Sequence, residues 1–128
     1  MYVRFVITAI DPDSTKRQGL FQALGDLHDS RSLLEFEDAV YLEIRDWFRC
    51  NLNRPDRLAK SNRPHAKNVA LSWFKDTALE HIKKMREMAN ILEAHGYSVE
   101  MIKSERPGFI VYEDAYQVAA EPFRSTIT

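Results

Sequence analysis

Strand-type sequence at both ends of the chain encloses a helical middle, and this order restricts the folds available to the 128 residues. In residues 2–10 every second side chain is apolar, the period of a strand with one buried face. Three more extended runs follow near the carboxyl end, at residues 97–103, 109–113 and 116–121. Because only short turns separate these runs, we expect consecutive strands to be antiparallel.

Two further features refine the expected strands. Residues 109–112 are apolar on both faces, which predicts an inner strand of the sheet, and Pro122 should end the last strand. The run at residues 69–74 fits either a strand or the first turns of a long helix. We favour the strand, because a helix-start signal follows at Thr77 and makes the run a separate element.

Two helices are expected before this run. Residues 20–27 carry apolar side chains at helical spacing and predict a short helix. Ser32 and Glu35 have the spacing of a capping box, in which each side chain accepts a hydrogen bond from the backbone amide of the other residue. A longer helix should therefore begin at Leu33, and it should end before Pro55.

A third helix is expected after Thr77. Glu80 stands three residues later, again the spacing of a capping box, so the helix should begin at Ala78. Its apolar face continues to His95, and Gly96 suits the left-handed position that ends many helices.

The order of these elements predicts an α+β fold. We expect the N-terminal strand to join the C-terminal strands in a mainly antiparallel sheet of four or five strands, with about three helices packed on one face. A chain of this length has room for one domain, covering residues 1–128. Residues 53–67 are polar and contain two prolines, which predicts a long basic loop.

Composition and termini exclude several classes of protein. Hydrophobic residues at 45% and charged residues at 29% are globular values and argue against a disordered or fibrous chain. A single cysteine, Cys50, excludes an intrachain disulfide and the cysteine pairs of zinc ribbons. The N-terminal apolar run contains Arg4 and is too short for a secretion signal, and no other run is long enough to span a membrane. We expect a cytoplasmic protein without a membrane partner.

The net charge of -1 conceals a local basic segment. Residues 49–67 contain six basic residues and one acid, whereas residues 1–48 contain nine acids and five bases. Guanidinium and ammonium groups bind phosphate and carboxylate, so we expect a non-catalytic binding or regulatory module that engages an anionic protein or nucleic acid. Alternatively, these side chains pair with the acidic helix before them and are otherwise hydrated. The candidate binding residues are Arg49, Arg54, Arg57, Lys60, Arg63 and Lys67.

Neither a metal site nor a cofactor is predicted. Asp76 and Glu80 have a spacing that suits metal ligation, but no third ligand is signalled, and acids near a helix start stabilise the helix dipole without a metal. A homodimer through an exposed sheet edge, or through the face that carries Trp47 and Phe48, is a further possibility.

One set of residues suggests an enzyme instead. Arg4, Ser72 and Glu113 follow an order that is similar to the strand-borne Arg, Ser and Glu of ADP-ribosyltransferases. The resemblance implies an NAD-dependent enzyme in which the arginine holds a phosphate, the hydroxyl orders the site and the carboxylate stabilises the cation left by nicotinamide. The family's fuller hydroxyl-rich motif and paired-acid turn are absent. Such an enzyme would use a cleft between the sheet and the loop, with Glu113 and Arg4, or the pair Asp76 and Glu80, as its working groups.

Overall fold

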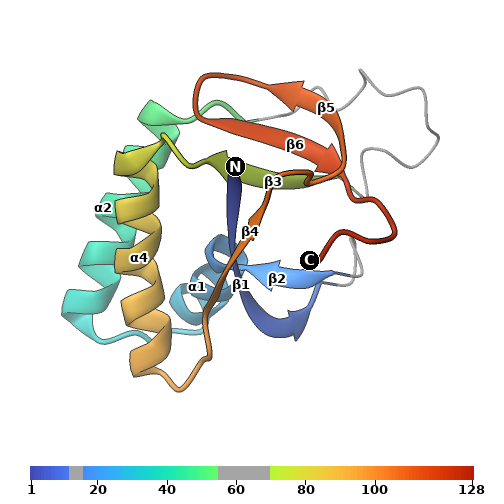
Figure 1. Cartoon of the computed structure of the whole chain (residues 1–128). Coiled ribbons are helices and arrows are strands. Elements are labelled where there is room, and N and C mark those ends of the chain that lie inside the picture. The colour runs from blue at the N-terminus through green and yellow to red at the C-terminus, as the bar shows by residue number, and fades with distance from the viewer. Residues whose placement is uncertain (12–15, 55–69) are drawn as a thin grey trace.

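The computed structural model describes residues 1–11, 16–54 and 70–128, and its described part has the expected α+β class. The strands all pair antiparallel, and the helices pack with the sheet they form (Figure 1). The elements, in chain order, are β1 (Tyr2–Ile10), β2 (Arg17–Gly19), α1 (Leu20–Asp29), α2 (Glu35–Asn51), β3 (Leu71–Lys75), α4 (Leu79–Ala94), β4 (Glu100–Ser104), β5 (Phe109–Glu113) and β6 (Gln117–Glu121).

Strand β1 is the centre of the sheet, because it pairs with three other strands. The order is β2-β1-β3-β6-β5, and β4 pairs with β1 as well. Val6 is in register with Gly19 of β2 and with Glu100 of β4, so these two strands lie on opposite sides of β1. Val3 is in register with Phe74, which puts β3 on the same side as β2. The sheet is therefore split between β2 and β3.

The two faces of the sheet carry separate apolar clusters. The larger cluster lies under the three helices and includes Val3, Phe5 and Phe74. The opposite face holds a smaller cluster that includes Val6 and Trp73. Figure 1 shows α2 and α4 side by side, with α1 beside β1. The alternation of residues 2–10 thus serves two cores, one on each face of the strand.

The position of the last three strands differs from the prediction. The run at 109–113 is an edge strand, not an inner one, and Phe109 and Ile110 are 49% and 38% exposed. The inner strand is β6, all five residues of which are buried. Strands β4 and β5 do not pair despite their short link, because β4 pairs with β1. The three-residue strand β2 was not predicted, since it is too short to show a period.

The link between β4 and β5 requires a glycine. Gly108 has φ +142°, a conformation that other residues rarely adopt. A Cβ at this position would lie 1.9 Å from the carbonyl oxygen of Glu121, at the end of β6. The chain therefore crosses the end of β6 so closely that no side chain fits between them.

The helices are where the sequence predicts them, but the capping of their first turns differs from the prediction. Helix α2 begins at Glu35, and Glu37 rather than Glu35 accepts the hydrogen bond of the first turn, from the Leu34 amide at 2.9 Å. Helix α4 follows Ala78, which offers no side-chain cap, so neither predicted capping box forms.

The other end of α4 and the strand after it agree with the prediction. Gly96 has φ +87°, the left-handed conformation expected after the last turn of α4. The strand favoured within 69–74 is confirmed as β3. No helix in the described part of the chain is long and apolar enough to cross a membrane.

Candidate functional site

A cleft of about 1090 Å³ opens where the sheet splits between β2 and β3. Its walls come from β1, the start of α1, the second half of α2 and β3. Much of the wall is apolar and includes Phe5, Leu20, Phe48 and Phe74. The volume is of the order of natural ligand sites, which measure roughly 300–1000 Å³. The split of the sheet thus creates a concave surface large enough for a small molecule.

Four arginines line this cleft, and they come from three parts of the chain. Arg4 stands on β1, Arg45 and Arg49 stand on α2, and Arg54 follows that helix. Asp11 is the acidic residue among the described lining. Because guanidinium groups remain protonated at neutral pH, the described wall carries an excess of positive charge.

Arg4 is the most unusual of the four, because it is only 8% exposed. It alternates along β1 with Val3 and Phe5, which contact the helices, so it belongs to the opposite face of the strand. Its Nη2 donates a hydrogen bond of 2.7 Å to the Arg17 carbonyl on β2. Its Nη1 is buried, and no described residue accepts a hydrogen bond from it.

Burial also changes the protonation equilibrium of Arg4. Desolvation, with a smaller contribution from the charge of Arg17, lowers the pKa of Arg4 to about 10, while Asp11 opposes this shift. The group is still protonated at neutral pH. A buried cation with an open hydrogen-bond donor is costly unless it is neutralised, and an anion in the cleft would neutralise it.

The other three arginines lie nearer the surface. Arg45 and Arg49 are four residues apart and therefore lie on the same side of α2. The Arg45 guanidinium lies 5.9 Å from the centre of the Tyr41 ring, and its buried Nε has no hydrogen-bond partner among the described residues. Arg49 approaches Asp46 at 3.7 Å, but both side chains are about two-thirds exposed, so the pair is weak.

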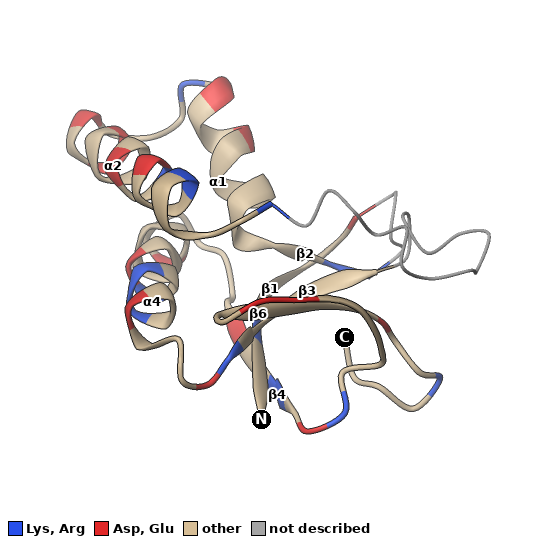
Figure 2. Cartoon of the chain, turned by 90° about the horizontal axis from the view of Figure 1, so that it is seen from above, with Lys and Arg blue, Asp and Glu red and all other residues tan. Residues whose placement is uncertain are grey.

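The two ends of α2 differ in charge. Glu35, Glu37 and Asp38 occupy its first turn, whereas Arg49 stands in its last turn (Figure 2). The acids agree with the helix dipole at the amino end, and the arginine agrees with it at the carboxyl end. The same arrangement keeps the acidic turn away from the cleft, which is lined by the second half of the helix.

The amino end of α1 also opens on the cleft. Gly19 precedes the helix in an extended conformation and supplies no side chain to cap it, and the first turn contains no acid. Gly19, Leu20 and Phe21 all line the cleft. Helix amides without an intrahelical partner attract anions, so α1 adds to the positive potential of the four arginines.

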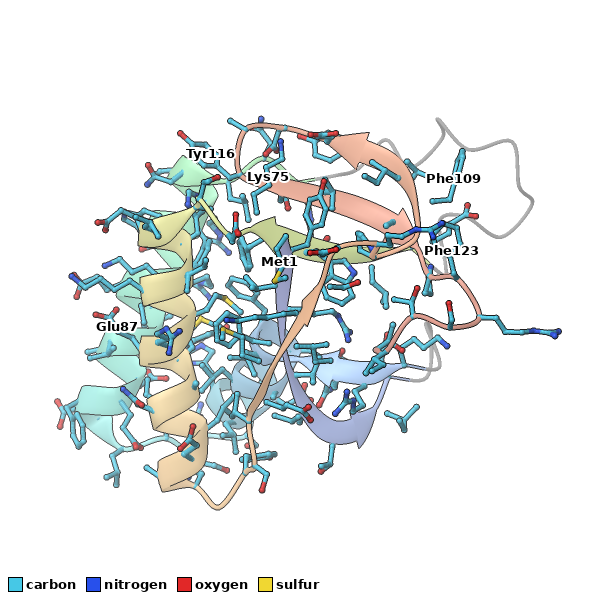
Figure 3. All side chains as sticks on the ribbon, viewed as in Figure 1. Met1, Lys75, Glu87, Phe109, Tyr116 and Phe123 are labelled. Carbon is cyan, nitrogen blue, oxygen red and sulfur yellow. The ribbon has the colours of Figure 1, made fainter. Side chains whose placement is uncertain are left out.

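Two polar contacts fix the end of α2 beside the sheet. Buried His81 of α4 stacks on Tyr116 with ring centres 4.4 Å apart, and its Nε2 is 2.8 Å from the Asn51 carbonyl oxygen. Gln117 Nε2 donates to the Asn53 carbonyl. The segment that carries Arg54 is therefore held against β6. Tyr116 is itself held in place, because the Lys75 amide donates to its carbonyl at 2.8 Å, and Figure 3 shows the two residues close together.

The binding residues predicted from the sequence are only partly described. Arg49 and Arg54 line the cleft. The other four members of the predicted set, Arg57, Lys60, Arg63 and Lys67, lie outside the described residues. Arg45 was not among the predicted residues. It stands four residues before Arg49 on the same predicted helix, and this spacing could have indicated that the two arginines share one side of it.

The residues considered for catalysis or metal binding are not all brought together. Arg4 and Ser72 line the same cleft, but Glu113 stands on the edge strand β5 and pairs with Lys75 at 2.7 Å. Asp76 lies 3.8 Å from the N-terminal amine. Among the described residues, no three His, Cys, Asp or Glu side chains form a group that could hold a metal ion.

Comparison with known proteins provides no further assignment of the site. No protein family, curated protein or solved structure matches this chain.

Proposed function

We propose that the protein is a binding module for an anionic partner and that the cleft between β2 and β3 is its binding site. The observation that carries this proposal is the gathering of four arginines, against one acidic residue, in the described lining of the cleft. Arg45, Arg49 and Arg54 extend the same positive charge toward the surface. An acidic protein or a nucleic acid would contact these three arginines at the rim of the cleft.

The charge of the cleft supports binding over a purely structural role. Buried charges in proteins are normally paired with an opposite charge. Arg4 instead bonds a neutral carbonyl and is close enough to Arg17 for their repulsion to lower its pKa. Asp11 compensates this in part. A bound anion would compensate the rest and would gain charge-assisted hydrogen bonds.

Charge reversal at the rim of the cleft tests the proposal. We expect the double variant Arg49→Glu, Arg54→Glu to lose at least about tenfold in affinity for a short oligothymidylate or a polyglutamate peptide, and to lose the salt dependence of that binding. Lys83→Glu, Arg124→Glu is the matched control, because it changes the net charge equally at exposed positions that do not line the cleft. Equal affinity of the two double variants, or no binding of any anion by the native protein, would contradict the proposal.

A further inference from the structure

We infer that the outer side of α2 is a docking surface for a basic amphipathic helix of another protein. This side of the helix lies away from the cleft, so the inference goes beyond the proposed function and does not depend on it. It rests on a second row of apolar residues along α2 and on the acidic residues beside that row.

The second row runs parallel to the buried side of the helix. The buried residues of α2 are Glu37, Tyr41, Ile44 and Phe48. The residue before each of them belongs to an outer row, which consists of Phe36, Val40, Glu43, Trp47 and, one step further, Cys50. Steps of four and three residues keep these positions on one side of a helix, and the same steps form the seam between paired helices. At about 1.5 Å per residue, the outer row offers about 21 Å of contact to a second helix.

Much of the outer row is open to solvent. Phe36 is 67% and Val40 is 38% exposed. Cys50 is exposed as well, and Trp47 is partly buried against the helical core. A single exposed apolar side chain is ordinary on a protein surface. Exposed apolar side chains that repeat at seam spacing are typical of a helix side that binds a partner helix.

The charges beside the outer row favour a basic partner. Glu43 stands within the row, and Glu35 and Asp46 each precede one of its members, on the edge that faces away from the core (Figure 2). Asp46 is 67% exposed, and no described residue forms an ion pair with Glu35 or Glu43. An apolar residue opposite Glu43 would leave a carboxylate unpaired beneath the partner helix, whereas a lysine or arginine would pair with it.

The basic residues near the outer row do not cancel this charge. Lys84 of α4 touches the row, but its ammonium is engaged, since it lies 5.6 Å from the centre of the Trp47 ring and 3.9 Å from Glu87. Arg45 comes about two and a half turns after Phe36, which places it on the opposite side of α2, where it lines the cleft. Helix α2 therefore presents arginines to the cleft and acids to its outer side.

A second copy of the chain suits this surface less well than a basic helix. In an antiparallel pair of α2 helices, the outer row of one copy would lie against the outer row of the other. Glu43 is at the centre of the row, so it would face Glu43 of the second copy. Like charges opposite each other oppose association.

Binding of a designed peptide to the full chain, followed by fluorescence anisotropy, tests the inference. The probe is a labelled peptide of about 21 residues in which leucine repeats at seam spacing and lysine fills the other positions. One control peptide has the same composition in scrambled order, and another carries glutamate in place of lysine. We expect the lysine peptide to bind at least about tenfold more tightly than either control, because it alone matches both the spacing and the charge.

Two variants with matched controls locate the binding. The double variant Phe36→Ser, Val40→Ser should lose at least about tenfold of the affinity for the lysine peptide, whereas Ile127→Ser, at a residue that is 70% exposed elsewhere, should keep it. Glu43→Lys should lose the lysine peptide and bind the glutamate peptide instead. Glu93→Lys should do neither, because Glu93 comes about two and a half turns after Lys84 and lies on the opposite side of α4. Circular dichroism checks that each variant is folded, and if the double variant is not, Glu43→Lys decides alone.

The outcomes are separate from those of the proposed function. No binding of the lysine peptide, or equal binding of all three peptides, overturns the inference. Unchanged affinity of the folded double variant or of Glu43→Lys does so too. Light scattering tests the other occupant: a native dimer that the double variant turns into a monomer would show that a second copy covers the outer row, which also overturns the inference. None of these results affects the proposed function, which depends on Arg49 and Arg54 in the cleft.

Discussion

Replacement of Arg4 by methionine should stabilise the protein in the absence of any ligand. The reason is that Arg4 keeps its charge in a place where it is poorly solvated. Its pKa falls from the usual value of arginine to about 10, mainly through burial and next through the charge of Arg17. Methionine has a similar length and no charge, so it would fill the same space without that penalty.

The size of the effect follows from the pKa. The fall of the Arg4 pKa to about 10 corresponds to roughly 3–4 kcal/mol, at about 1.4 kcal/mol per pH unit. The lost hydrogen bond to the Arg17 carbonyl offsets about 1.5–2 kcal/mol of this gain. We therefore expect Arg4→Met to raise the free energy of unfolding by about 1–2 kcal/mol, in the range found when buried charges are replaced by apolar residues.

The pH dependence has a definite sign. A base whose pKa is lower in the folded state destabilises that state wherever the group is charged in both states. The penalty of Arg4 is thus fully present below about pH 10 and is relieved as the pH rises through that value toward the usual pKa of arginine. At neutral pH the whole difference between the native protein and Arg4→Met should be measurable.

Urea denaturation followed by tryptophan fluorescence is a suitable assay, because Trp73 is buried and should report unfolding. With a urea dependence of about 1–3 kcal/mol per molar, the midpoint should rise by roughly 0.5–1 M. Lys83→Met at an exposed position is the control and should change stability by less than about 0.5 kcal/mol. A variant Arg4→Met that is less stable than the native protein would refute the reasoning, since Arg4 would then contribute to folding and not to a ligand site.

Two further predictions concern the scaffold. Gly108→Ala should destabilise the protein by about 3 kcal/mol or more, because its Cβ would overlap the Glu121 carbonyl. The control Gly96→Ala should cost only about 1 kcal/mol, because its Cβ meets nothing within 4 Å and only the positive φ is unfavourable. Similar melting temperatures of the two variants would contradict the close crossing at Gly108. Hydrogen bonds from His95 and from the Leu34 amide lower the pKa of Glu37, so its contribution to stability should be present above about pH 4.3 and disappear as the pH falls through the folded-state pKa. Glu37→Gln should therefore flatten the acid side of a plot of melting temperature against pH, and an unchanged slope would contradict this.

The elements of the fold were predictable, because each has a local signal. The alternation in residues 2–10 and the helical spacing before Gly96 depend only on neighbouring residues, and both predictions are confirmed. The partners of the strands were not predictable in the same way. Residues 109–112 are apolar on both faces and suggested an inner strand, yet β5 is at the edge, because pairing depends on contacts distant in the sequence.

The candidate site, too, was predictable from the sequence only in part. Local charge counting found the basic segment after residue 48, and two of its members, Arg49 and Arg54, line the cleft. The environment of Arg4 could not be foreseen, because it depends on the gap that β2 and β3 leave along β1. An arginine within an apolar strand was the visible signal, but only the three-dimensional arrangement shows that it is buried beside Arg17 of β2.

The three pairings of β1 also bear on how the protein is made. Tyr2 is synthesised well before its neighbours in the sheet, Lys75 and Ser104. The second half of β1 can pair early with β2, but the half that begins at Tyr2 stays unpaired until β3 and β4 have been synthesised. Contacts between such distant residues slow folding, and an exposed apolar strand is prone to aggregate. We expect the complete sheet, and with it the cleft, to form after translation of β4, so that the unpaired half of β1 needs protection during synthesis.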